Sequence, residues 1–219
     1  MNQFRIARNA YLSRNITGYH NLYYTGYREP ENPDFLNILK NTYNSTSIYD
    51  LQTARNKVVE ILTNDIPAVM IDNILTSCTC ICIPRSKALQ SYTGSQLLFR
   101  EAVSIASSKL CGVIDGSQII QRHTDTFTTH FSRTKNPSRV ALTGLTTTKI
   151  DGNDGLMPYP GITKDTCYID ANSVRGKDII LIDDIYTLGV NIDEDGIQAL
   201  LDIGANNVIF YAIAYTRRG

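Results

Sequence analysis

The sequence contains no tryptophan and only three histidines and three methionines, and its 21 basic residues balance its 21 acidic ones. A formal net charge of zero gives no overall attraction to nucleic acid or to an anionic membrane surface. No apolar run approaches the roughly 20 residues of a membrane span, and the N-terminal sequence MNQFRIARNAYLSRN lacks the apolar stretch of a secretory signal. These absences predict a cytoplasmic chain that has no membrane partner and is not expected to bind nucleic acid.

Cysteine is also scarce, and its spacing disfavours most cysteine chemistry. Of five cysteines, three alternate in the segment CTCICIP, as Cys78, Cys80 and Cys82. On a strand these side chains would point to one face, whereas a zinc site more often uses a CxxC pair with ligands elsewhere. We therefore interpret the segment as a buried strand in which cysteine is a small hydrophobic residue. Zinc or redox chemistry is the open alternative.

The length and composition fit a globular protein with a substantial core. With 219 residues and 42% hydrophobic content, one domain with an elaboration is expected. We divide the chain into an N-terminal segment, residues 1–65, which could form a hood or subdomain, and a core, residues 66–219. The apolar spacing of Leu51–Leu62 predicts a helix, with Asp50 as its N-cap.

Strand and helix patterns alternate along the core. The apolar runs PAVMIDNIL and TCICIP predict buried strands. The apolar stripe between Thr93 and Leu110 predicts a helix. SQIIQR predicts a short strand that ends at Arg122, and the polar stretch after it, with its Gly and Pro residues, predicts a loop and a hairpin or loop insertion.

The last third of the chain has the clearest pattern. KDIILID predicts a strand, Asn191–Leu201 predicts a helix that stops at Gly204, and NNVIFYAIAY predicts a second strand. A strand, a helix and a strand in so short a span predict two parallel strands joined by a right-handed crossover. The predicted fold class is therefore α/β, a Rossmann-like and mostly parallel sheet flanked by helices.

Two adjacent acids, Asp183 and Asp184, come at the carboxyl end of the predicted strand. Ligands of open α/β sheets bind at this edge, and the loop that follows leads to a helix N-terminus, which attracts anions. Asn191 and Glu194 are interpreted as a capping box at the start of that helix. The carboxylates could accept hydrogen bonds from sugar hydroxyls, and the loop and helix N-terminus beside them could bind a phosphate. Together they predict a phosphorylated sugar as the ligand. A solvent-facing pair of loop acids is the alternative.

The segment IILIDDIYTLGVN resembles the phosphoribosyl pyrophosphate (PRPP) motif of type I phosphoribosyltransferases. GIQALLDIGANNVIFYAIAYTR is similar to the helix and strand that follow in that family, and ICIPRSKALQSYTGSQLLFREAVSIASSKL to its pyrophosphate loop and helix. The closest branch is the ComF-like, amidophosphoribosyltransferase-type proteins. The resemblance spans about residues 69–217. It implies the type I phosphoribosyltransferase fold with a small hood.

The resemblance implies an enzyme that transfers a ribose 5-phosphate unit from PRPP to a nitrogenous acceptor, with Mg²⁺ as cofactor and pyrophosphate as product. Asp183 and Asp184 would be the catalytic residues and would bind the ribose hydroxyls; either could reach the Mg²⁺, which substrate oxygens and waters would mostly hold. The other implied substrate-binding residues are Arg85, Ser86 and Lys87 for pyrophosphate, and Tyr186, Thr187, Leu188, Gly189, Val190 and Asn191 for the 5′-phosphate. The cations of a closing loop would be Arg122, Arg133, Lys135 and Arg139.

The chain departs from the family pattern at two positions of the phosphate loop. The family usually has Thr just before the loop glycine and Thr or Ser two residues after it, where this chain has Leu188 and Asn191. Each lost hydrogen bond to a charged group could cost about 1.5–3 kcal/mol, although Asn191 could donate through its amide. The departures favour a second hypothesis, a non-catalytic module that senses PRPP or a nucleotide. A ComF-like accessory protein is a third, and the acceptor and a homodimeric state stay open.

Overall fold

The computed structural model describes residues 1–26, 29–40, 46–85, 87–124, 128–129, 157–158, 162 and 166–217. At its centre is a six-stranded sheet in the order β1-β2-β10-β9-β3-β4. Its strands are β1 (Asn2–Ile6), β2 (Ile16–Tyr24), β3 (Cys78–Cys82), β4 (Val113–Asp115), β9 (Asp178–Tyr186) and β10 (Asn207–Thr216). Every neighbouring pair is parallel except β1 and β2. The predicted α/β fold with a mostly parallel sheet is confirmed.

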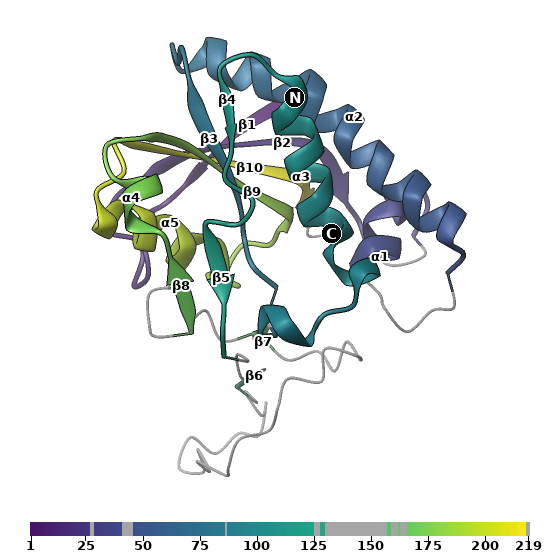
Figure 1. The fold of residues 1–219 in the computed structure, drawn as a ribbon. Coiled ribbons are helices and arrows are strands. Elements are labelled where there is room, and N and C mark those ends of the chain that lie inside the picture. The colour runs from purple at the N-terminus through teal and green to yellow at the C-terminus, as the bar shows by residue number, and fades with distance from the viewer. Residues whose placement is uncertain are drawn as a thin grey trace.

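Helices cover both faces of this sheet (Figure 1). They are α1 (Asp34–Lys40), α2 (Ile48–Asp72), α3 (Leu98–Lys109), α4 (Ala171–Val174) and α5 (Ile192–Ile203), with 3₁₀ turns η1 (Leu89–Ser91) and η2 (Gly94–Leu97). Alternate residues of β9 face two buried clusters, because successive side chains of a strand point to opposite faces. Ile180 and Ile182 pack with α1, α2 and α3, whereas Ile179 and Leu181 pack with α5.

Two short antiparallel pairs lie outside the main sheet. They are formed by β5 (Ile120–Arg122) with β8 (Cys167–Ile169), and by β6 (Thr128–Thr129) with β7 (Met157–Pro158). β5 confirms the predicted strand that ends at Arg122. β4, with only three residues, has no counterpart among the predicted elements. None of the helices in the described residues is both long and apolar enough to cross a membrane.

The N-terminal segment belongs to the same sheet as the C-terminal strands. β2 pairs in parallel with β10, and β1 continues the sheet beyond β2. The division that we expected after residue 65 falls inside α2. The first 65 residues therefore supply two edge-side strands, one short helix and most of a long one to a shared architecture.

Helix α2 differs from the prediction at both ends. Most of the run PAVMIDNIL, predicted as a strand, forms its C-terminal part: Pro67 to Asp72 are helical, with Val69 and Met70 buried against the core. A short apolar run does not separate a buried strand from a buried helix by its period. The N-cap is Ser47, whose hydroxyl accepts a hydrogen bond from the Asp50 N–H at 3.0 Å, so the prediction of Asp50 as the cap was wrong.

Strand β3 is buried throughout, as predicted. Cys78, Cys80 and Cys82 all lie in the cluster that packs with α2 and α3, which confirms that they share one face and serve as core residues. Burial raises the pKa of the Cys82 thiol to about 11. This thiol is therefore protonated at neutral pH and is a poor nucleophile.

Candidate functional site

The carboxyl ends of β3 and β9 bring the two predicted halves of the site together. The strands are parallel neighbours whose last paired residues are Cys82 and Ile182, and the Ile83 N–H still donates to the Ile182 carbonyl at 2.9 Å. Beyond this point one chain continues to Arg85 and the other to Asp183. A cationic loop and an acidic pair therefore begin at adjacent positions on one edge of the sheet.

Asp183 and Asp184 lie inside β9 rather than after it. β3 stops pairing at Ile182, but β10 accompanies β9 as far as Tyr186, so the acids are held on one side by a strand. Each carboxylate accepts a hydrogen bond from the next backbone N–H: Asp184 N to Asp183 Oδ1 at 2.8 Å, and Ile185 N to Asp184 Oδ1 at 2.7 Å. Both side chains are half-buried. Their positions are thus fixed by local backbone contacts.

Three acids are buried in the first turn of α5, and the sequence analysis did not predict their burial. Asp193, Glu194 and Asp195 are each 3% exposed or less. Burial, followed by the nearby and hydrogen-bonded Asp183 carboxyl, raises the pKa of Asp193 well above its usual range. Asp195 instead accepts a hydrogen bond from the Ile162 N–H at 2.6 Å. The positive end of the helix dipole favours acids at this position.

The predicted capping box at the start of α5 is wrong. Asn191 occupies the N-cap position but makes no capping bond, and its Nδ2 donates to the Gly189 carbonyl at 3.1 Å. Glu194 accepts a hydrogen bond from the Tyr186 hydroxyl at 2.9 Å. Burial raises the pKa of Glu194, although the bond from Tyr186 opposes this shift. Both predicted partners are therefore engaged elsewhere.

The loop predicted to wrap a 5′-phosphate presents few side chains for that role. Tyr186 is 1% exposed and packs among aromatic rings, with its centroid 5.0 Å from that of Phe4 and 5.6 Å from that of Phe210. Thr187 shares a hydrogen bond with the Thr216 hydroxyl at 2.7 Å, and Leu188 is 52% exposed. Gly189, Val190 and Asn191 are partly buried. A phosphate at this loop would therefore meet mainly backbone N–H groups.

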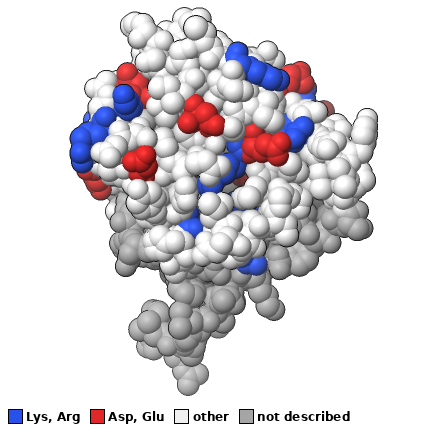
Figure 2. Space-filling model, viewed as in Figure 1, with Lys and Arg blue, Asp and Glu red and all other residues white. Residues whose placement is uncertain are grey.

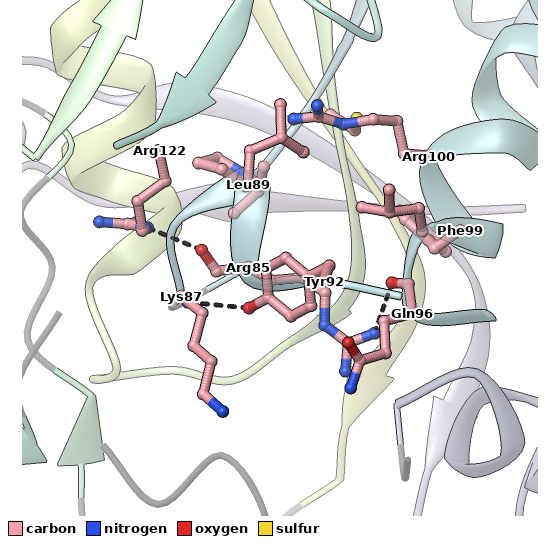
Figure 3. Close-up of a pocket in the computed structure, with 12 residues that line it drawn as sticks. Arg85, Lys87, Leu89, Tyr92, Gln96, Phe99, Arg100 and Arg122 are labelled. Atoms are coloured by element: carbon pink, nitrogen blue, oxygen red, sulfur yellow. Dashed lines mark hydrogen bonds between the residues drawn. The ribbon is translucent and has the colours of Figure 1, made fainter. Parts of the chain in front are cut away.

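The loop after β3 borders a small cavity lined by four cationic residues, as Figure 3 shows. Arg85 and Lys87 lie on the loop, Arg100 lies on α3, and Arg122 is the last residue of β5. The volume of about 30 Å³ corresponds to about two water molecules. As it stands, this cavity is too small to enclose a diphosphate, and a ligand would have to bind at its mouth.

Arg122 fixes the course of this loop. The side chain is 2% exposed, and its Nε donates to the Arg85 carbonyl at 2.7 Å while Nη1 donates to the Thr166 hydroxyl at 2.7 Å. We predicted Arg122 as part of a closing loop. In the structure it is instead buried beneath the loop after β3. Its guanidinium has enough N–H groups to donate to both the carbonyl and the hydroxyl.

The Arg85 side chain points toward α1 and the 3₁₀ turn η2. Its Nη1 donates to the carbonyls of Leu39, at 3.1 Å, and Gln96, at 2.9 Å, and its guanidinium lies over the Tyr92 ring, 5.4 Å from the centroid. The Lys87 side chain points away from these groups in Figure 3, although its backbone N–H donates to the Tyr92 hydroxyl. Of Arg85 and Lys87, the two cations predicted to bind pyrophosphate, Lys87 has the side chain that points away from the neighbouring protein groups.

Sequence reasoning missed Arg100. It lies on α3 and donates to Gln118 Oε1 at 3.0 Å and to the Ile120 carbonyl at 2.8 Å. A single arginine on the polar side of an amphipathic helix carries no signal of its own. Its place beside the β3 loop follows from the packing of α3 on β3 and β4.

Several predicted residues fall outside the described part of the chain: Ser86, Arg133, Lys135 and Arg139. His123 is exposed, and its Nδ1 shares a hydrogen bond with the Thr124 hydroxyl at 2.8 Å. Figure 2 shows basic side chains at a hollow in the middle of the viewed face, with acidic side chains around it. Within the described residues, no group of three or more His, Cys, Asp or Glu is placed to hold a metal ion.

Comparisons of the chain with protein-family models, with curated proteins and with solved structures found no match.

Proposed function

We propose that this protein is a phosphoribosyltransferase-like enzyme, which transfers a ribose 5-phosphate unit from PRPP to a nitrogenous acceptor and releases pyrophosphate. The pairing of Cys82 with Ile182 at the ends of β3 and β9 carries the proposal, because it starts a cationic loop beside the Asp183–Asp184 pair. PRPP has the complementary order of groups, an anionic diphosphate next to a diol. Cations suit the first and carboxylates the second.

The reaction needs little covalent chemistry from the protein. The bond between C1 of the ribose and the diphosphate oxygen breaks, and pyrophosphate leaves with the electron pair. A nitrogen lone pair of the acceptor forms the new bond to C1, and the nitrogen then loses a proton. The transition state resembles an oxocarbenium ion, as in glycoside cleavage. The chain would contribute by holding the phosphates, stabilising the leaving group and excluding water.

Asp183 and Asp184 would accept hydrogen bonds from the ribose hydroxyls. Each already accepts one backbone N–H through Oδ1, and a carboxylate can accept several hydrogen bonds at once. Lys87 and Arg85 would face the diphosphate, and the backbone of residues 187–191 would face the 5′-phosphate. The three groups of the ligand would thus meet three neighbouring segments of one sheet edge.

The residues present fit a magnesium ion that the substrate brings. Carboxylate oxygens are suitable ligands, and Mg²⁺ usually keeps several waters and binds through one or two carboxylates plus substrate phosphates. Asp183 and Asp184 are the candidate protein ligands. When bound, the ion would neutralise charge on the departing diphosphate.

Calorimetric titration with PRPP and Mg²⁺, combined with an assay of released pyrophosphate in the same samples, tests the proposal. We expect binding and slow pyrophosphate release by hydrolysis, with faster release when the right acceptor is added from a panel of nitrogenous metabolites. Absence of any PRPP binding would contradict the proposal.

A second candidate function is a sensor that binds PRPP or a nucleotide without consuming it. The observation that favours it is the loop before α5, where Leu188 offers no hydroxyl and the Asn191 amide is bonded within the protein. Tight PRPP binding with no pyrophosphate release, even with candidate acceptors added, would support the sensor over the transferase.

A further inference from the structure

The connection between β1 and β2, residues 7–15, folds into a compact loop. Asn9 Oδ1 accepts hydrogen bonds from the backbone N–H groups of Tyr11, at 2.8 Å, and Leu12, at 3.1 Å, and the Asn9 N–H donates to the Leu12 carbonyl at 2.9 Å. Leu12 is 1% exposed and belongs to the core cluster of α5. The loop is therefore anchored both by its own hydrogen bonds and by a buried side chain.

This loop lies along α5, as the purple connection beside that helix in Figure 1 shows. Two hydrogen bonds join them: Asn9 Nδ2 donates to Asn191 Oδ1 at 3.1 Å, and the Ser13 N–H donates to Gln198 Oε1 at 2.8 Å. Asn191 and Gln198 are seven residues apart, which is about two helical turns, so they lie on one side of the helix. The loop thus reaches the point where α5 begins.

Asn191 is the residue that links this loop to the proposed phosphate loop. Its backbone is left-handed, with φ 64° and ψ 8°, a conformation that Asn tolerates better than most residues. Its side chain spans both neighbours, because Oδ1 accepts from Asn9 and Nδ2 donates to the Gly189 carbonyl. Gly189 also has a positive φ, of 88°. The directions of the backbone N–H groups before α5 depend on these two positions.

We infer that Asn9 is a positioning residue for the phosphate end of the site: through Asn191 it holds residues 187–191 in the shape that receives the 5′-phosphate of the sugar. The inference rests on the proposed function. It explains how a loop without the family's hydroxyl donors could still bind a phosphomonoester. Backbone N–H groups bind well only when they are already aimed at the ligand, and the Asn9–Asn191 bond fixes their direction.

The test compares two ligands that occupy different ends of the proposed site. Ribose 5-phosphate would engage the loop before α5, whereas pyrophosphate with Mg²⁺ would engage the loop after β3. We expect Asn9→Ala to weaken ribose 5-phosphate binding about tenfold and to change pyrophosphate binding by less than about twofold. The matched control is Asn15→Ala, which removes an acceptor of the Arg8 N–H in the same loop and should leave both affinities unchanged.

A double-mutant cycle separates positioning from a general loss of structure. Asn191→Gly keeps access to the left-handed backbone and removes the side chain. If Asn9 acts through Asn191, then Asn9→Ala has no further effect on ribose 5-phosphate affinity in the Asn191→Gly background. Thermal unfolding of each variant shows whether it is folded at the temperature of the titration.

Three results would overturn the inference: unchanged ribose 5-phosphate affinity in Asn9→Ala, equal losses for both ligands, or an effect that persists in full in the Asn191→Gly background. Each of these leaves the proposed function standing if the wild-type chain binds both ligands. A wild-type chain that binds neither ribose 5-phosphate nor pyrophosphate would overturn the proposed function, and this inference with it.

Discussion

The two segments that continue beyond the last paired residues of β3 and β9 carry opposite charge. On the β3 side, Arg85 and Lys87 are joined by Arg100 and Arg122 around one cavity. On the β9 side, Asp183 and Asp184 are followed by the buried acids of residues 193–195. The net charge of zero conceals this separation. We call the first set the cationic half and the second the acidic half.

The halves also differ in how their charges are held. In the cationic half, Arg100 and Arg122 donate to carbonyl, amide and hydroxyl oxygens. In the acidic half, Asp183 and Asp184 accept hydrogen bonds from backbone N–H groups, and the buried acids of α5 lie at the positive end of that helix. These bonds to neutral groups help to fix the position of each charge. Such an edge is suited to a ligand with an anionic group beside several hydroxyls.

The largest expected effect comes from removing the charge of the acidic half. The double change Asp183→Asn and Asp184→Asn should weaken PRPP binding at least about hundredfold, since two charged acceptors are lost at roughly 1.5–3 kcal/mol each. Calorimetry with PRPP and Mg²⁺ measures the loss. Asp178→Asn, at the other end of β9, is the matched control and should bind normally. Unchanged affinity in the double variant would remove the acidic half from the site.

The second largest expected effect is on stability, and it concerns the buried Arg122 of the cationic half. Arg122→Leu removes the donors to the Arg85 carbonyl and the Thr166 hydroxyl, so we expect the free energy of unfolding to fall by about 2–3 kcal/mol. Urea unfolding measures it. Arg55→Leu, which breaks an exposed pair with Glu101, should cost no more than about 1 kcal/mol. Equal costs for both variants would show that burial of Arg122 adds nothing.

For the acidic half, we predict how stability depends on pH through Asp193. The pKa of Asp193 is raised in the folded protein by burial and by Asp183. The folded state therefore retains this proton as pH rises above the unfolded pKa of about 3.9, and stability is lost progressively until the folded pKa is passed. Asp193→Asn removes that loss, so the variant should be more stable than wild type at pH 7 and no more stable near pH 3.5.

The matched variant for this series is Asp195→Asn. Asp195 accepts the Ile162 N–H at 2.6 Å, so its change to Asn should not stabilise the protein at pH 7. Urea unfolding at pH 3.5, 5 and 7 gives the free energies. A gain for Asp193→Asn that does not grow with pH would contradict the raised pKa of Asp193.

The smallest expected effect concerns the phosphate loop between the halves. Leu188→Thr introduces a hydroxyl at an exposed position and should tighten ribose 5-phosphate binding about threefold to tenfold, which corresponds to a net gain of about 0.7–1.4 kcal/mol from one added hydrogen bond. Leu188→Val, which has the same shape as Thr without the hydroxyl, should not tighten it. A gain in both variants would point to side-chain size rather than hydrogen bonding.

The C-terminal strand–helix–strand unit was predictable because its pattern is local and complete. The apolar period of β9 and β10, the helix between them and the stop at Gly204, with φ 101°, all follow from neighbouring residues. The predicted strand at PAVMIDNIL failed for the opposite reason. The run lacks a distinguishing period, and its first six residues are helical because they belong to α2, which packs against the sheet.

The candidate site divides in the same way. The sequence alone determined that acids and a glycine-containing loop stand between a buried strand and a helix, and that Arg85 and Lys87 follow another buried strand. Only the tertiary structure decided that these strands are neighbours, that Arg122 is buried under the β3 loop, and that Asn9 contacts Asn191 across 182 positions of sequence. Local patterns report which residues a short segment buries or exposes. Contacts between distant segments depend instead on the packing of the whole sheet and its helices, which no single segment encodes.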